Sequence, residues 1–244
     1  MIRVTDLYKS FGEVKAVQGI SFSASDGEVT GLLGPNGAGK TTTLRMLYSL
    51  LPPDAGEISI DGLDPSRDAI TIKNTIGVVP DNRGLYARLT ARENIQYYGR
   101  LHGMQESAIR QRVEEFVELL NMADFIDRRA GQFSQGQRVK VAIARAMVHD
   151  PQTVLMDEPS NGLDVMSNRE LRKYILDLKA AGRSVVLSTH IMQEVTALCD
   201  RIVIIAAGRI AADGTAEQLL HSSGCASIED AFVKLIGSDE GLLA

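Results

Sequence analysis

The chain has 244 residues, of which 44% are hydrophobic and 23% charged, and its formal net charge is −5. This length allows a well-buried core in one large domain, and the composition is ordinary for a globular protein. The acidic balance argues against a nucleic-acid coat protein, which needs a basic surface, so we expect no nucleic-acid partner. No apolar stretch reaches the roughly 18 residues that a bilayer-spanning helix requires.

Short apolar runs alternate with longer amphipathic runs along the chain. Helices are predicted after Lys40, Asp157 and His190, and a last one over 228–236. The alternation predicts an α/β fold with a largely parallel sheet, and the extra strands and glycine-rich turns of the first sixty residues predict an antiparallel flank. The predicted strands span 2–5, 28–33, 57–60, 76–79, 154–156, 185–188 and 202–205.

The middle of the chain differs, because no strand is convincing between about 90 and 150. Apolar residues recur there at helical spacing, which predicts helices with one buried face. We therefore predict a single domain over 1–244. Its sheet core and β flank comprise 1–89 and 151–220, an inserted helical subdomain comprises 90–150, and a C-terminal helix and tail comprise 221–244.

A complete phosphate-binding loop spans Gly34–Thr41, between a buried apolar run at 29–33 and a helix-like run. Strand, glycine loop and helix start are the context that this motif requires. Glycines let backbone N–H groups turn inward, and the helix start offers further unpaired donors to an anion. We expect Lys40 to reach the terminal phosphates and the Thr41 hydroxyl to suit Mg²⁺.

Two further predicted strands end in polar residues. Thr153–Glu158 runs into two acids, and strand ends are where open parallel sheets bind ligands. We expect Asp157 to hold Mg²⁺ opposite Thr41, and Glu158 to polarise a water. His190 ends the next strand and can hydrogen-bond a γ-phosphate, although a lone histidine is more often structural.

A serine and a glycine precede a long helical run in Phe133–Gln137. Ser134 is a good helix N-cap, and Gly136 permits close backbone approach. A cap alone explains the serine, whereas a second anion contact explains both residues. Spacing alone leaves both interpretations open.

Together and in this order, the motifs resemble those of the ATP-binding subunit of an ABC transporter, and the resemblance covers about residues 2–220. It implies a P-loop NTPase fold of the ABC ATPase type, with a RecA-like, mainly parallel core, an antiparallel β flank and an inserted α-helical subdomain. The matching motifs are Walker A at Gly34–Thr42, the signature at Phe133–Gln137, Walker B at Thr153–Glu158, the D-loop at Ser160–Asp164 and the switch histidine at His190.

The resemblance also implies ATP and Mg²⁺ as cofactors and roles for named residues. Glu158, His190 and Lys40 would be catalytic, and Thr41, Asp157 and Asp81 would contact the metal. Phe11 would stack on adenine, which tolerates any aromatic ring. Two copies would pair head to tail as a homodimer, each completing the other's ATP site. The implied nucleotide contacts are Phe11, Gly34, Pro35, Asn36, Gly37, Ala38, Gly39, Lys40, Thr41, Thr42, Ser134, Gly136 and Asp164.

Two positions depart from the family pattern. Gln135 replaces a glycine of the signature, although Gly136 is retained. Asp81 stands where the family has the Q-loop glutamine. Aspartate brings a negative charge and a shorter arm to that position, which puts the usual metal contact in doubt.

The stretches 82–86, 188–195 and 199–201 resemble exporters of the ABC-2 type, and most of all the ATPase subunits of bacterial sodium-efflux systems. The resemblance implies membrane permease partners and a peripheral place on the cytoplasmic face of the inner or plasma membrane. Exporters of drugs or other small molecules have similar sequences in these stretches. A non-transport ABC ATPase is a further alternative, but the insert is too short for a long coiled coil and the chain holds one ATPase unit.

Overall fold

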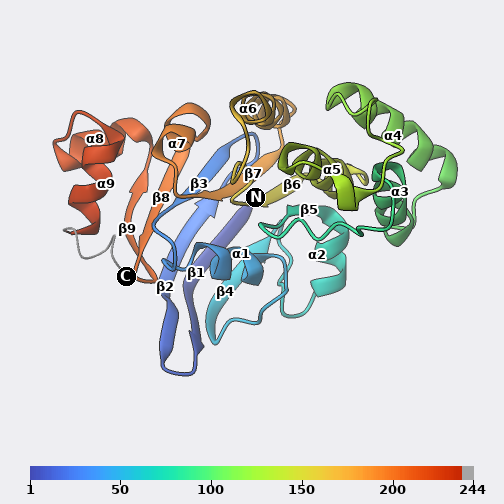
Figure 1. Cartoon of the computed structure of the whole chain (residues 1–244). Helices are drawn as coiled ribbons and strands as arrows, with labels where there is room; N and C mark the ends of the chain where they lie inside the picture. Colours follow the sequence, from blue (N-terminus) through green and yellow to red (C-terminus); the bar gives the residue numbers. More distant parts are fainter. Residues whose placement is uncertain (238–244) are drawn as a thin grey trace.

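The computed structural model describes residues 1–237 and contains two sheets with helices around them (Figure 1). The larger sheet has six strands, and the first five in its spatial order are parallel while the last pairs antiparallel. Its strands, in spatial order, are β5 (Ile76–Val79), β6 (Thr153–Asp157), β7 (Ser184–Thr189), β3 (Val29–Leu33), β8 (Arg201–Ala206) and β9 (Arg209–Gly214).

The smaller sheet is antiparallel and has the order β2-β1-β4. It comprises β1 (Ile2–Phe11), β2 (Val14–Ala24) and β4 (Ala55–Ile60), which confirms the antiparallel flank. β2 and β9 were not predicted, and β1 is longer than its predicted range of 2–5. These strands mix buried and exposed residues, so they lack the continuous apolar runs by which the central strands were found.

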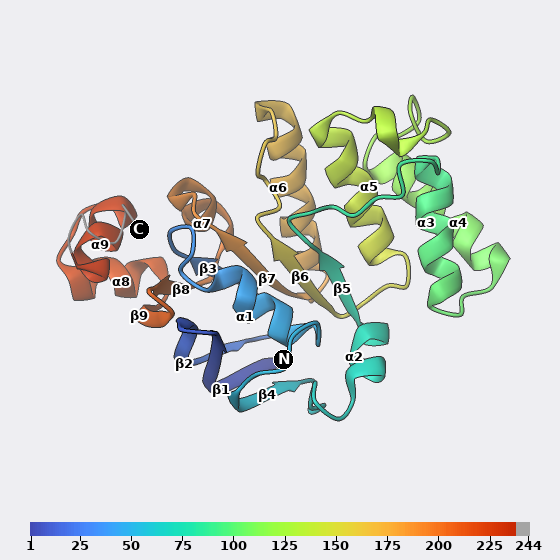
Figure 2. The same ribbon diagram turned by 60° about the horizontal axis from the view of Figure 1, so that its bottom comes forward.

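Helix α1 (Lys40–Leu47) lies between the two sheets (Figure 2). Its buried residues Leu44, Met46 and Leu47 join a core that takes side chains from both sheets. Helices α6 (Val165–Ala180) and α7 (Met192–Leu198) follow β6 and β7 as predicted, while α2 (Ala69–Thr75) was not predicted. The parallel strands are thus covered on both faces, as their fully buried sequences require.

The residues between β5 and β6 are helical, as predicted. They form α3 (Ala91–Leu101), α4 (Glu106–Leu119), the short 3₁₀ turn Ala130–Gln132 and α5 (Gln135–Met147), which gather on one side of the molecule (Figure 1). Most of α5 is buried, because it packs on α3 and also against β5. The inserted helical subdomain is confirmed, and α5 joins it to the sheet; the boundaries at 90 and 150 stay a prediction.

Two helices, α8 (Ala216–Ser223) and α9 (Ile228–Ile236), end the described chain. They bury Leu219, Ile228 and Phe232 against Leu33 and residues of α7 and β8. The sequence predicted α9 at these bounds and missed α8, and the predicted tail beyond residue 237 lies outside the described residues. No helix within 1–237 is both long and apolar enough to cross a membrane.

We expect Phe232→Ala to lower the free energy of unfolding by about 3–5 kcal/mol, because it empties a large site in a packed core. Phe232 is 2% exposed, whereas its neighbour Val233 is 41% exposed. Val233→Ala is therefore the matched control and should cost less than about 0.5 kcal/mol. Urea unfolding of both variants measures the difference, and equal midpoints would show that α9 is not part of the core.

Candidate active site

Three parallel strands bring the predicted chemistry to one edge of the sheet. β7 lies between β3 and β6, with Leu33 paired to Thr189 and Asp157 paired to Ser188. The carboxyl ends of these strands therefore meet, although the chain segments are far apart in sequence. The phosphate loop, the two acids and His190 leave the sheet at this edge.

The phosphate loop has the backbone conformation that its glycines permit. Gly37 and Gly39 have φ of 80° and 105°, in the left-handed region that other residues avoid. Gly39 precedes α1 directly, and a Cβ there would lie 2.4 Å from the carbonyl oxygen of Ala16. A Cβ at Gly34 would lie 2.1 Å from the Ile205 carbonyl oxygen, so close backbone approach fixes these positions.

The Lys40 ammonium lies beneath this loop and is 5% exposed. Its Nζ donates to the carbonyl oxygens of Gly34 at 2.7 Å and Pro35 at 3.0 Å. It also lies 3.4 Å from Oε1 of Glu158. A buried cation needs such partners. The Glu158 carboxylate and the loop carbonyl oxygens together hold the Lys40 ammonium at the start of α1. The N-terminus of a helix already favours an anion, and this ammonium adds to the attraction.

Asp157 and Thr41 are in direct contact. The Thr41 hydroxyl donates to Oδ1 of Asp157 at 2.9 Å, and the Ser188 hydroxyl donates to the same oxygen at 2.6 Å. Hydroxyl and carboxylate oxygens are the ligands that Mg²⁺ prefers. Two of the three residues that were assigned to the metal, Thr41 and Asp157, thus lie side by side.

Glu158 stands at the centre of a chain of three charged or polar groups. Its Oε2 is 2.9 Å from Nδ1 of His190, while its Oε1 faces Lys40. Its backbone is left-handed, with φ of 47°, which is uncommon for a residue with a side chain. Such conformations persist where surrounding contacts impose them, and they gather at functional sites.

These groups line a cavity of about 480 Å³. It brings together most residues predicted for the phosphates, together with Asp81, Glu158 and His190. Gly34, Pro35 and Asp157 lie behind its wall and hold Lys40 and Thr41. Its lining residues are Ala16, Asn36, Gly37, Ala38, Gly39, Lys40, Thr41, Thr42, Asp81, Glu158, Asn161 and His190.

Ser134, Gly136 and Asp164 do not line this cavity. They lie together where α5 and α6 begin. The contacts here bear on the two interpretations of Ser134, a helix cap or a second anion contact. Ser134 caps α5 by accepting from the Gln137 N–H, and a Cβ at Gly136 would lie 2.5 Å from the Ser167 hydroxyl. Asp164 accepts from the same hydroxyl at 2.9 Å. Contacts within one chain therefore already account for the serine and the glycine.

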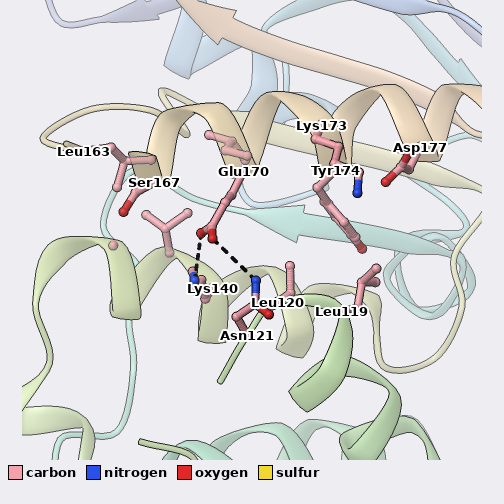
Figure 3. A pocket seen from close by; sticks show the side chains of 13 residues that line it. Leu119, Leu120, Asn121, Lys140, Leu163, Ser167, Glu170, Lys173, Tyr174 and Asp177 are labelled. Atoms are coloured by element: carbon pink, nitrogen blue, oxygen red, sulfur yellow. Dashed lines mark hydrogen bonds and ion pairs between the residues drawn. The ribbon is translucent and has the colours of Figure 1, made fainter. Parts of the chain in front are cut away.

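A second cavity, of about 180 Å³, lies between α5, α6 and the end of α4 (Figure 3). Gly136 and Ser167 stand at its rim, and the Lys140 ammonium pairs with the Glu170 carboxylate at 2.8 Å across it. Gly136 thus lines this second cavity and not the phosphate cavity, while Ser134 is exposed.

Phe11 ends β1 and is 48% exposed, with the Lys9 ammonium 5.8 Å from its ring centre. An exposed ring is not a core phenylalanine, which was the alternative to adenine stacking. Phe11 is outside the residues that line the phosphate cavity, while Ala16 of the adjoining β2 is among them.

Sequence reasoning missed three residues that hold the site. Asn161 and Ala16 line the cavity, and Ser188 holds the Asp157 carboxylate and the Glu158 N–H. Ser188 carried a usable signal, since a hydroxyl inside an apolar strand next to the acid strand has to find a polar partner. Ala16 carried none, because its place depends on how the two sheets meet.

A family model described as ABC transporter matches residues 17–161, which is more than half of the chain. The chain belongs to the ABC transporter family. Within it, the chain is an ATP-binding subunit and an ATPase, and the predicted fold class is confirmed. Two curated ATP-binding relatives and two solved structures show how far the likeness extends.

The relative NatA of Bacillus subtilis, an ABC transporter ATP-binding protein, is 45% identical over 227 residues, with 91% of this chain and 92% of NatA covered. The linearmycin resistance ATP-binding protein LnrL of the same organism is 36% identical, with 92% and 72% covered. A solved ATP-binding subunit of an ABC transporter has a TM-score of 0.90 at 29% identity, with 97% and 100% covered. A dimeric ATP-binding cassette bound to ADP and Pi has a TM-score of 0.81 at 26% identity, with 88% and 98% covered.

We expect Gly39→Ala to abolish ATP binding, because its Cβ would meet the Ala16 carbonyl oxygen and the loop would have to move. Gly62→Ala is the matched control. Gly62 also has a positive φ, of 84°, but a Cβ there meets no atom of residues 1–237 within 4 Å, and Gly62 does not line the phosphate cavity. Titration of both variants with a fluorescent ATP analogue checks this, and unchanged affinity in Gly39→Ala would contradict the loop geometry.

Proposed function

We propose that this ATPase powers an exporter by hydrolysing ATP at the phosphate cavity, with Glu158 as the general base. The observation that carries the proposal is the contact of Glu158 with both Lys40 and His190 at the mouth of the phosphate loop. A base must stand within hydrogen-bond reach of the proton that it takes. Glu158 accepts a proton as the water oxygen attacks the γ-phosphorus, and the bond to the bridging oxygen of the leaving ADP breaks.

The surrounding residues position the triphosphate. The loop backbone and Lys40 bind its phosphate oxygens, and His190 exchanges its contact with Glu158 for one with the γ-phosphate. Thr41 and Asp157 fit Mg²⁺, since their oxygens already meet at 2.9 Å. When bound, Mg²⁺ neutralises charge on the phosphates. Asp81 lines the same cavity and would place a further carboxylate near the metal.

The second part of the proposal is a head-to-tail homodimer. Ser134, Gly136 and Asp164 lie outside the phosphate cavity of their own chain, so they would complete the cavity of the partner subunit. The exposed Ser134 stands at the first turn of α5, which suits contact with a γ-phosphate. That a similar cassette bound to ADP and Pi is dimeric supports a dimer for this chain. Phe11, exposed at the end of β1, would stack on adenine.

The third part concerns cargo and place. The motif resemblance described in the sequence supports an exporter of the ABC-2 type that moves sodium, and the likeness to the linearmycin resistance protein LnrL supports export of a drug-like molecule as the alternative. In either case the chain would bind permease subunits at the cytoplasmic face of the membrane. A non-transport role has no relative among those described above to support it.

We expect Glu158→Gln to keep ATP affinity and to lose hydrolysis by at least about 100-fold, because the amide cannot accept the proton. The variant should then accumulate as an ATP-bound dimer in size-exclusion chromatography with light scattering. Glu217→Gln, an exposed glutamate in the first turn of α8, is the control and should behave like the wild type. Wild-type turnover in Glu158→Gln would refute the base assignment.

The transported substrate is identified with the complex of this chain and its permease, reconstituted in sealed vesicles. If sodium is exported, ATP hydrolysis should rise with the sodium concentration on the cytoplasmic side and should not respond to potassium. Stimulation by hydrophobic drugs without any sodium response would favour the alternative exporter. Flux of radioactive sodium against its gradient provides the direct measurement.

A further inference from the structure

Arg83 lies in the loop between β5 and α3 and is 5% exposed. Its guanidinium donates to two pairs of backbone carbonyl oxygens. One pair belongs to its own loop, Pro80 at 2.9 Å and Asp81 at 3.0 Å. The other pair follows β6, Glu158 at 3.2 Å and Pro159 at 3.1 Å. A single side chain therefore joins the loop that carries Asp81 to the turn that carries the base.

The peptide groups on both sides of Glu158 are held. Its N–H donates to Ser188, at 3.0 Å to the hydroxyl and 3.2 Å to the carbonyl oxygen. Its carbonyl oxygen accepts from Arg83 and from the N–H of Asn161. This residue has the left-handed backbone described above, which needs such contacts to persist. The direction of the Glu158 side chain follows from that backbone.

A second buried arginine extends the connection to α5. Arg145 donates to the carbonyl oxygens of Arg83 at 2.8 Å and Gly84 at 2.9 Å. Its guanidinium carbon also lies 4.5 Å from the centre of the Tyr98 ring on α3. Helix α5 begins at the Ser134 cap, so its position is linked through Arg145 and Arg83 to the backbone of Glu158.

Arg83 is held by backbone hydrogen bonds and not by an ion pair. Burial lowers the pKa of its guanidinium, and its Nε finds no hydrogen-bond partner in the described part of the chain, residues 1–237. The nearest carboxylates contribute only at longer range, since no ion pair with Arg83 is formed among residues 1–237. The planar guanidinium places several N–H donors in a fixed arrangement, so it can reach four carbonyl oxygens at once. The single ammonium group of a lysine cannot reproduce this arrangement.

We propose that Arg83 is a positioning residue of the ATPase reaction. Its guanidinium holds the Glu158 backbone in the conformation that directs the carboxylate into the cavity. Arg145 connects Arg83 to helix α5 through the carbonyl oxygens of Arg83 and Gly84. The inference rests on the proposed role of Glu158 as the base. It adds that the loop carrying Asp81 and the helix carrying Ser134 act on hydrolysis through the carbonyl contacts of Arg83.

The test compares Arg83→Lys with the matched control Arg183→Lys. Arg183 also donates to two backbone carbonyl oxygens, those of Asp150 and Pro151, but it lies before β7, at the opposite end of the strand from His190. The kcat and KM for ATP, the Kd of a fluorescent ATP analogue and the urea midpoint are measured for each variant. Arg83→Ala is assayed with and without millimolar guanidinium.

We expect Arg83→Lys to lower kcat by about 10- to 100-fold, as small misplacements of catalytic groups do, while Kd changes by less than about 3-fold. Arg183→Lys should keep kcat within about 2-fold of the wild type. Guanidinium should restore turnover to Arg83→Ala, because it can refill the carbonyl-lined site, and methylammonium should not.

Two results would overturn the inference: wild-type kcat in Arg83→Lys, or a loss of ATP affinity as large as the loss of kcat. If the substituted proteins do not fold at 37 °C, the guanidinium rescue is measured at the lowest temperature at which the wild type turns over, and absence of rescue there counts against the inference. Turnover in Glu158→Gln would instead refute the proposed base. An inactive Glu158→Gln beside a fully active Arg83→Lys would remove only the role of Arg83.

Discussion

The parallel alignment of β3, β7 and β6 is the constraint on which the site depends. Parallel neighbours end at the same edge, so residues that follow three distant strands meet there without any further device. Leu33 and Thr189 are paired, and the loop after the first and the histidine after the second become neighbours. If one strand ran the other way, the phosphate loop and Glu158 would lie at opposite ends of the sheet.

Burial of charge at that edge explains the contacts seen around the phosphate cavity. Lys40 and Glu158 are both buried and face one another, and each also has neutral or ionisable partners of its own. Removing either charge would leave the other without compensation, which is costly in a buried site. The pair therefore preserves two charged groups close to the cavity in which we propose that a triphosphate and an attacking water bind.

The sequence predicted what depends on local pattern. The phosphate loop was found because its glycines have to adopt positive φ before a helix, and β5 and α9 were found at their observed bounds because their apolar residues are regular. β2, β9, α2 and α8 were missed, since their residues are partly exposed or their runs are short. Tertiary contacts select these elements, and no local pattern marks them.

The candidate site shows the same division. Lys40, Thr41, Asp157, Glu158 and His190 come together as their motifs predict. The contacts of Arg83 could not be predicted from the sequence, because its partners are backbone carbonyl oxygens, and every residue carries one. Ser134 and Gly136 had two interpretations, a helix cap with close packing or a second anion contact. The contacts within one chain fit the first and do not exclude the second. A contact with a second chain leaves no trace in the packing of the first.

The most direct test of the account is a structure of Glu158→Gln with Mg²⁺ and ATP. We expect a dimer in which the Ser134 hydroxyl of one subunit lies within hydrogen-bond distance of the γ-phosphate held at Gly39 and Lys40 of the partner subunit. A structure in which each triphosphate is enclosed by one chain, with both serine–glycine turns distant from any γ-phosphate, would contradict it.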